Sequence, residues 1–244
     1  MVNTADCGSV MQGFDSLISP HFKIEVNSYE LIFFKGRIIN MSEKIDINEL
    51  MLKYNFALST LETQLNILIR EYEFKNKYNP VEHIKSRIKT EKSTLDKLKR
   101  KGYELSLNNL KTHVKDIIGI RIVCSFLSDV NEIVYIIKKS KQFKIVSEKN
   151  YIENPKDTGY MSYHLIIEIP LYLNEKIEYI PAEIQIRTVA MDFFATLDHK
   201  IRYKFPGKIP DEVKVEMLAC STVIQSLDKK MYELNEIVKK YNDL

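Results

Sequence analysis

The chain has 244 residues, of which 45% are hydrophobic and 28% charged, so it can bury a sizeable core in one or two domains. The formal net charge of +3 is too small to indicate nucleic-acid binding by itself, so the location of the charge matters more than its sum. Three separated cysteines without a CxxC pair argue against a zinc site, and no apolar run approaches the roughly 20 residues of a membrane span, so we expect a cytoplasmic protein.

The first 40 residues are expected to be an irregular N-terminal extension. No helical or strand period persists there, and three glycines and a proline interrupt the segment: Gly8, Gly13, Gly36 and Pro20. The sequence Met41-Ser42-Glu43-Lys44 is typical of a bacterial start. We therefore interpret residues 1–40 as the product of a mis-called start, upstream of a domain over 41–205.

Two helices are expected next. From Asp46 to Lys77 apolar residues recur at intervals of three and four, which is the stripe of a long amphipathic helix. Pro80 suits the first turn of a second helix, and Gly102 suits its end. One face of this second helix would carry three cations and a hydroxyl that suit a triphosphate: Lys89, Ser93, Lys97 and Arg100. The alternative is a solvated surface of ordinary exposed charges.

The rest of the chain alternates strands and helices. Strands are predicted at about 120–126, 143–148, 162–169 and 179–187, with a helix from Ser128 through Ile137 between the first two. A further helix runs from Thr188 to about Tyr203, and a long final helix starts at Pro210 after a Pro-Gly break. The expected fold class is α+β, a mixed sheet of about five strands flanked by helices, with residues 206–244 as a C-terminal helical oligomerisation arm.

Two carboxylates mark the probable strands. Asp116 stands just before a β-branched run, where its carboxylate could hold Mg²⁺, a cation that prefers oxygen ligands and bridges phosphates. On the last strand, Glu183, Gln185 and Arg187 alternate with isoleucines and so share one face. A solvated outer face of a half-buried strand would give the same alternation, so each run alone leaves both interpretations open.

The segment between these carboxylates carries a candidate base-binding loop. Gly159 to His164 follows Pro155 and Lys156 and delivers an aromatic ring, a hydroxyl and an imidazole into the next strand. Tyr160 could stack on a purine while Lys156 and His164 meet its phosphates. A β-turn with a tyrosine packed on the core is the alternative interpretation of the same residues.

With these residues identified, the chain from about Tyr54 to Lys240 resembles a small alarmone synthetase of the RelA/SpoT-homology family, of the RelQ type. No P-loop of the GxxxxGK[ST] kind and no HExxH motif is present. The resemblance rests on these segments, in the family's order and spacing: Arg87 to Lys89, Lys97 to Lys101, Asp116 to Arg121, Gly159 to His164, Glu183 to Thr188 and Met191 to Lys204.

The resemblance implies transfer of the β,γ-pyrophosphate of ATP to the ribose 3′-hydroxyl of GDP or GTP, with Mg²⁺ as cofactor. It implies that Asp116 and Glu183 are catalytic and hold metal. ATP would be bound by Arg87 and Arg121 at the adenine and, at the phosphates, by Lys89, Ser93, Lys97 and Arg100. The guanine nucleotide would be bound by Lys149, Lys156, Tyr160, His164, Gln185 and Asp192.

Further implications concern partners and the acceptor. The resemblance implies a nucleotidyltransferase-like fold, a homotetramer built through the terminal helices and synthesis without hydrolysis, and it allows an alarmone effector and a single-stranded RNA regulator. The acceptor side departs from the family pattern at four positions: Lys149, Met161, Asp192 and Phe194. Two other functions stay open, a toxic relative that modifies tRNA or makes adenosine alarmones, and a non-catalytic basic RNA-binding module.

Overall fold

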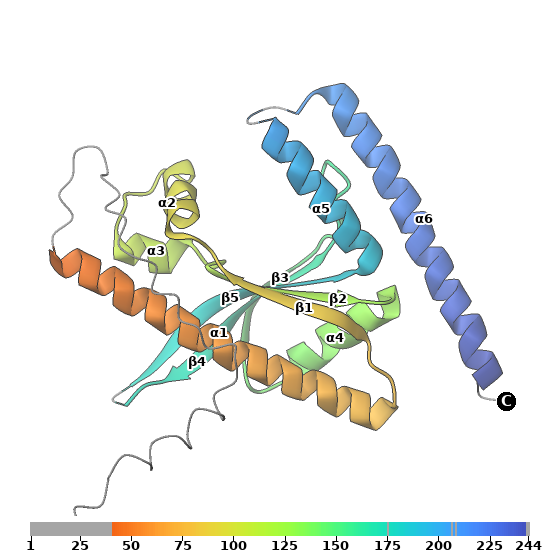
Figure 1. The fold of residues 1–244 in the computed structure, drawn as a ribbon, viewed down its shortest axis with the longest axis horizontal. Helices are drawn as coiled ribbons and strands as arrows, with labels where there is room; N and C mark the ends of the chain where they lie inside the picture. The colour runs from red at the N-terminus through yellow and green to blue at the C-terminus, as the bar shows by residue number, and fades with distance from the viewer. Residues whose placement is uncertain (1–40, 175, 206, 208, 243–244) are drawn as a thin grey trace, which may run out of the picture. The chain divides into compact units, whose positions relative to one another are not determined.

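The computed structural model describes residues 41–174, 176–205, 207 and 209–242, so the predicted extension over 1–40 lies outside the described residues. The elements run in the following order (Figure 1): α1 (Met41–Asn76), β1 (Val81–Ile88), α2 (Glu91–Arg100), α3 (Leu107–His113), β2 (Ile118–Cys124), α4 (Leu127–Lys139), β3 (Lys144–Asn150), β4 (Tyr163–Tyr172), β5 (Ile177–Thr188), α5 (Val189–Lys204) and α6 (Asp211–Asn242). None of the helices in the described part is long and apolar enough to cross a membrane.

The strands form one five-stranded sheet in the order β1-β2-β5-β4-β3. The two central strands β2 and β5 pair in parallel, whereas the other three pairings are antiparallel. Parallel neighbours need a crossover connection, and here the chain between them contains α4, β3 and β4. The prediction of a mixed sheet of about five strands flanked by helices is confirmed.

One face of the sheet is apolar and carries the core. Its side chains come from alternate positions of the central strands, such as Ile120 and Ile122 on β2 and Ile184 and Ile186 on β5, all fully buried or nearly so. Helices α1 and α4 cover this face and belong to the same hydrophobic cluster. The opposite positions of the same strands carry Arg121 on β2 and Glu183, Gln185 and Arg187 on β5, so the other face of the sheet is largely polar.

The prediction of a helix from Pro80 to Gly102 is wrong. Its first half is β1, which pairs antiparallel along β2, and only its second half, α2, is helical. The spacing of four between Ile84 and Ile88 fits a helix, but it equally fits two positions on one face of a strand. Pairing with β2 decides in favour of the strand, and α2 begins where the Thr90 side chain accepts a hydrogen bond from the backbone N–H of Ser93.

A second, smaller cluster joins α6 to the rest of the protein. Met161, which follows β3 in the loop to β4, packs with Met191 and Phe194 of α5 and with Met217 and Ile224 of α6. The buried Thr188 hydroxyl also donates to Asp228 of α6, at 2.8 Å. The C-terminal helix is therefore packed on the same side of the protein as the loop between β3 and β4.

Candidate active site

The polar face of the sheet holds a continuous row of side chains. Register places Arg121 of β2 beside Gln185 of β5, Gln185 beside His164 of β4, and His164 beside Lys149 of β3. Glu183 lies two residues along β5, opposite Gly119. Because paired residues of neighbouring strands point to the same face, four separate segments of the chain contribute to one surface.

Asp116 is held by two lysines just before β2. Its Oδ2 is 2.8 Å from the Nζ of Lys89 and 2.7 Å from the Nζ of Lys97. Burial raises the pKa of Asp116, but the hydrogen bonds from both lysines outweigh this effect and hold the pKa below its usual range. Lys89 is fixed by its backbone N–H, which donates to the carbonyl of Ile117 at 2.8 Å.

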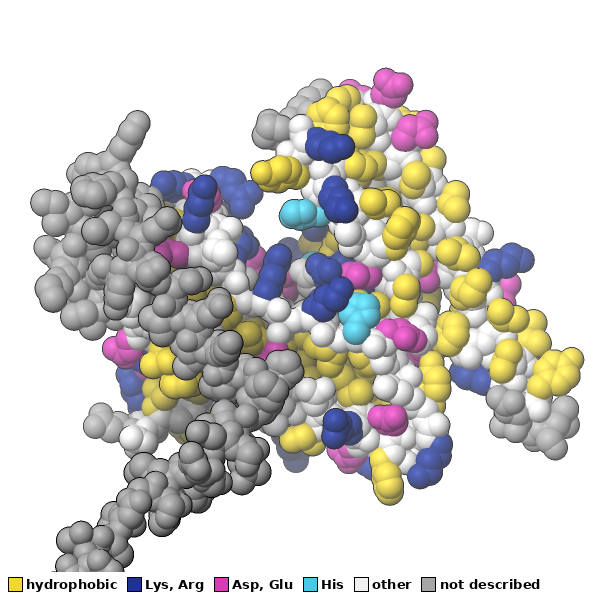
Figure 2. Space-filling view, in the orientation of Figure 1, with side chains coloured by type: hydrophobic (Ala, Val, Ile, Leu, Met, Phe, Trp, Pro, Cys, Tyr) yellow, Lys and Arg dark blue, Asp and Glu magenta, His cyan; other side chains and the backbone are white. Residues whose placement is uncertain are grey.

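The predicted row of cations is only partly on a helix. Lys89 lies in the connection before α2, whereas Ser93, Lys97 and Arg100 follow each other at spacings of four and three along α2 and share a face. Thr90, which caps α2, also donates its hydroxyl to that of Ser93 at 3.0 Å. Figure 2 shows the surface hollowed between α2 and α5, with Lys, Arg and His side chains around the hollow.

Arg87 and Arg121 lie on neighbouring strands and on the same face. Arg87 is opposite Gly119, two residues from Arg121, so the two arginines are diagonal neighbours, about 7 to 8 Å apart at the backbone. Position Gly119 carries no side chain, and Arg87 lies over it, with Cγ 3.7 Å from where a Cβ would be. Two guanidinium groups so arranged can flank a planar base.

Glu183 lies at the centre of a hydrogen-bonded chain. Its Oε1 is 3.1 Å from Nδ1 of His164, and its Oε2 accepts from Gln185 at 2.8 Å. The other ring nitrogen, Nε2 of His164, is 3.0 Å from the hydroxyl of Tyr160. Burial raises the pKa of Glu183, but the hydrogen bonds from His164 and Gln185 outweigh it, so that the pKa lies below its ordinary value.

Arg187 completes this network and was not among the predicted site residues. It is buried, with 1% of its surface exposed, and it donates to the Tyr160 hydroxyl, to Gln185 and to Asp192. The Tyr160 hydroxyl can thus accept from Arg187 and donate to Nε2 of His164, which leaves the proton of His164 on Nδ1, facing Glu183. The strand alternation was the available signal, because it already placed Arg187 on the face of Glu183.

Asp192, at the start of α5, forms ion pairs with both Arg121 and Arg187. Its Oδ1 is 3.1 Å from Nη1 of Arg121 and 3.2 Å from Nη1 of Arg187. One carboxylate therefore connects the predicted donor side, where Arg121 lies, to the predicted acceptor side, where Arg187 holds Tyr160.

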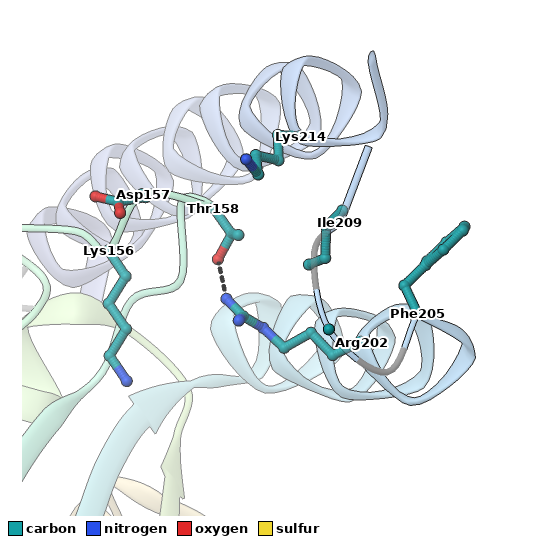
Figure 3. A pocket seen from close by; sticks show the side chains of 8 residues that line it. Lys156, Asp157, Thr158, Arg202, Phe205, Ile209 and Lys214 are labelled. Carbon is teal, nitrogen blue, oxygen red and sulfur yellow. Dashed lines mark hydrogen bonds between the residues drawn. The ribbon is translucent and has the colours of Figure 1, made fainter. Parts of the chain in front are cut away.

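Two further predicted residues, Lys156 in the loop between β3 and β4 and Lys149 on β3, lie near the site. The Nζ of Lys156 lies 4.6 Å from the ring centroids of both Tyr151 and Tyr160, and burial together with the nearby charge of Arg202 lowers the pKa of this lysine. Lys149 is exposed on β3, beside His164. Beyond Lys156 an open pocket of ≈ 660 Å³ continues to Arg202 of α5 and Lys214 of α6 (Figure 3).

Asp116 is a suitable ligand for a metal ion. Its Oδ1 is buried and without a hydrogen-bond partner, which is rare for a carboxylate oxygen in a folded protein. Across the described residues no group of three or more metal-ligating side chains occurs. Mg²⁺, however, is commonly bound by one or two carboxylates together with phosphates and water, so Asp116, with Glu183 on the neighbouring strand, fits that cation.

Comparisons with known proteins agree on one family. Residues 86–208 match the family described as "Region found in RelA / SpoT proteins". The chain is 44% identical over 191 residues to GTP pyrophosphokinase YwaC of Bacillus subtilis (strain 168), covering 78% of this chain and 90% of that relative.

Solved structures agree as well. Small alarmone synthetase 2 from Bacillus subtilis is 43% identical with a TM-score of 0.70, covering 78% of this chain and 98% of the other. Small alarmone synthetase 1 from the same organism, bound to its product pppGpp, is 33% identical with a TM-score of 0.73, covering 80% and 98%. The predicted family is confirmed, and the chain belongs to the RelA/SpoT family.

Proposed function

We propose that this protein is a (p)ppGpp synthetase of the stringent response, which transfers the β,γ-pyrophosphate of ATP to the ribose 3′-hydroxyl of GDP or GTP and releases AMP. The observation that carries the proposal is Asp116, which is held by two lysines and stands three residues before Gly119, the register partner of Glu183. Support also comes from the relative bound to pppGpp, which is 33% identical over most of both chains.

On the donor side, four residues would hold the ATP phosphates. Lys89 and Lys97 now share one oxygen of Asp116, and a triphosphate would offer both ammonium groups more negative charge than that carboxylate does. Ser93 lies in the first turn of α2, the end of a helix at which the helix dipole favours anions, and Arg100 follows on the same helix. Adenine would lie between Arg87 and Arg121, whose guanidinium groups bind a ring face to face.

Asp116 and Glu183 would hold Mg²⁺, and the buried, unpartnered Oδ1 of Asp116 supports this assignment. When bound, Mg²⁺ neutralises the charge on the transferred phosphates. Pyrophosphate transfer needs no covalent intermediate with the protein, so the protein's main contribution is to align the two nucleotides.

On the acceptor side, Glu183 would act as the base. The ribose 3′-oxygen attacks the β-phosphorus of ATP, the bond from that phosphorus to the oxygen shared with the α-phosphorus breaks, and AMP leaves with the electron pair. Glu183 takes the proton of the 3′-hydroxyl, and its lowered pKa means that it is ionised at neutral pH. It is then a weak base, suited to a hydroxyl that is already losing its proton in the transition state.

Six residues would bind the acceptor nucleotide. Tyr160 would stack on guanine, on a ring face now approached by Lys156, and the displaced ammonium would meet the acceptor phosphates together with Lys149. Gln185 and His164 orient Glu183 through their hydrogen bonds. Asp192 would approach the ribose from the start of α5, and a phosphate contact by His164 would require it to leave Tyr160 or Glu183.

The assay that tests the function uses ATP labelled in the γ-phosphate, Mg²⁺ and one acceptor in each reaction: GMP, GDP, GTP, ATP or deacylated tRNA. Thin-layer chromatography should reveal a labelled 3′-pyrophosphorylated guanosine nucleotide and, by ultraviolet absorbance, an equal amount of unlabelled AMP. Label transferred only to ATP or to tRNA would identify a relative with another acceptor. Absence of AMP in every reaction, with salt-sensitive RNA binding instead, would contradict an enzymatic function.

Replacing Tyr160 with alanine is expected to raise the acceptor KM by about tenfold or more, because stacking on a base contributes roughly 1 to 3 kcal/mol. Tyr160→Phe keeps the ring but loses the hydroxyl bonded to His164 and Arg187, so its acceptor KM should change less than that of the alanine variant. Tyr172→Ala, at a tyrosine that is 73% exposed at the end of β4, is the matched control. An unchanged acceptor KM in Tyr160→Ala would remove this residue from the acceptor site.

We further propose that the protein acts in the cytoplasm as a homotetramer joined through its terminal helices. The exposed apolar side chains of α6 support this assembly, among them Leu218 at 43%, Val223 at 68% and Leu234 at 53% exposure. Light scattering of the purified protein tests the subunit count, and a monomer at all concentrations would exclude the tetramer.

A further inference from the structure

The C-terminal helix α6 contacts the backbone of the loop that precedes β4. The hydroxyl of Ser221, a residue only 1% exposed, donates to the carbonyl of Gly159 at 2.7 Å. A Cβ at Gly159 would lie 2.3 Å from Cβ of Ser221, and the φ angle of this glycine is +80°. Gly159 is thus required both by its backbone conformation and by the close approach of α6.

Gly159 in turn fixes the two loop residues assigned to the acceptor. Its backbone N–H donates to the carbonyl of Lys156 at 2.7 Å, and the N–H of Lys156 donates to the carbonyl of Tyr160 at 3.1 Å. The next residue, Met161, is buried against Met217 and Ile224 of α6. The turn that presents Lys156 and Tyr160 is therefore built against one face of α6.

Helix α5 holds the same loop at the neighbouring residue. Nη2 of Arg202 donates to the hydroxyl of Thr158 at 2.8 Å (Figure 3), and Nε of Arg202 is fixed by Asp198. Since the loop has no regular secondary structure between Pro155 and Ser162, these contacts with two helices replace the ladder of hydrogen bonds that would otherwise hold it.

We propose that Ser221 is a positioning residue of the acceptor site: by holding Gly159, it keeps Tyr160 and Lys156 in the geometry that receives the guanine nucleotide. The proposal rests on the function proposed above, in which this loop binds the acceptor. It assigns a role in substrate binding to α6, which lies after the segment 86–208 that matches the family. The helix that is expected to join subunits would then also order the loop.

The test compares Ser221→Ala with Ser226→Ala. Both remove one hydroxyl from α6, but Ser226 is exposed and lies away from the loop contact. Loss of the hydrogen bond to Gly159 is expected to raise the acceptor KM by about five- to tenfold, with the ATP KM changed less than twofold. Ser226→Ala should resemble the unaltered protein in both constants.

Hydrogen exchange of the full-length protein supplies a readout that does not depend on catalysis. The backbone N–H groups of Lys156 and Gly159, which are bonded within the turn, should exchange at least several-fold faster in Ser221→Ala. Exchange in β2 and β5 should stay the same, because α6 packs mainly on α4 and α5 rather than on these strands.

The outcomes separate the two proposals. An acceptor KM unchanged in Ser221→Ala, or an equal rise in both KM values, would overturn the positioning role. If the unaltered protein makes no pyrophosphorylated guanosine nucleotide, the proposed function fails, and with it the assignment of the loop to an acceptor. Hydrogen exchange would then still show whether Ser221 holds the turn. Unchanged exchange rates of the Lys156 and Gly159 N–H groups in Ser221→Ala would refute that structural role as well.

Discussion

Asp116→Ala is expected to lower kcat by at least about 10³-fold while the protein stays folded. The variant loses a carboxylate that would hold Mg²⁺, and a bound metal ion contributes several kcal/mol of transition-state charge stabilisation, which corresponds to a loss of that size. It also loses the oxygen that fixes Lys89 and Lys97 relative to each other. Initial rates at saturating ATP and GDP measure the effect.

The fold should tolerate Asp116→Ala because the side chains of Asp116, Lys89 and Lys97 are all partly exposed to solvent. The side chain of Asp116 is 19% exposed, and those of Lys89 and Lys97 are 20% and 26% exposed, so both cations can be hydrated when their partner is removed. Asp96→Ala, on the exposed surface of α2, is the matched control for loss of a carboxylate nearby. Wild-type kcat in Asp116→Ala, with an unchanged thermal midpoint, would refute the assignment of Asp116 to the metal.

The carboxylate pair could be predicted because it follows strand periodicity. The β-branched run after Asp116 and the alternation from Glu183 to Arg187 identify β2 and β5, and parallel pairing of these strands places Glu183 beside Gly119, three residues from Asp116. The sequence does not encode this pairing locally, so the alternative of two solvated faces disappears only when the strands are seen side by side.

The features that the sequence does not predict all depend on contacts between residues distant in the sequence. The segment from Val81 to Ile88 has an ambiguous period, and only pairing with β2 makes it a strand. Arg187 is recognised as a buried network residue only when Tyr160 and Asp192 are seen to reach it. Ser221 could not be found at all from its neighbours in sequence, because its partner Gly159 is 62 positions away.

The second large effect is expected at Glu183. Glu183→Gln keeps the shape of the side chain but removes its charge and its ability to accept a proton from the ribose hydroxyl. Positioned general bases contribute about 10²- to 10⁴-fold to a rate, and kcat should fall within that range. The amide also conflicts with its neighbours, because His164 and Gln185 each contact one carboxylate oxygen, and an amide offers only one oxygen in place of two.

Glu178→Gln is the control that isolates this effect, since it makes the same chemical change on the same strand. Glu178 points to the opposite face of β5, where it pairs with Lys53 of α1, so this variant should synthesise product at the wild-type rate. Binding of ATP and of GDP to Glu183→Gln, measured by calorimetry, should change much less than kcat, because a base acts on the reacting proton rather than on the bound nucleotides. A kcat within threefold of wild type would exclude Glu183 as the base, and a loss confined to nucleotide affinity would make it a binding residue instead.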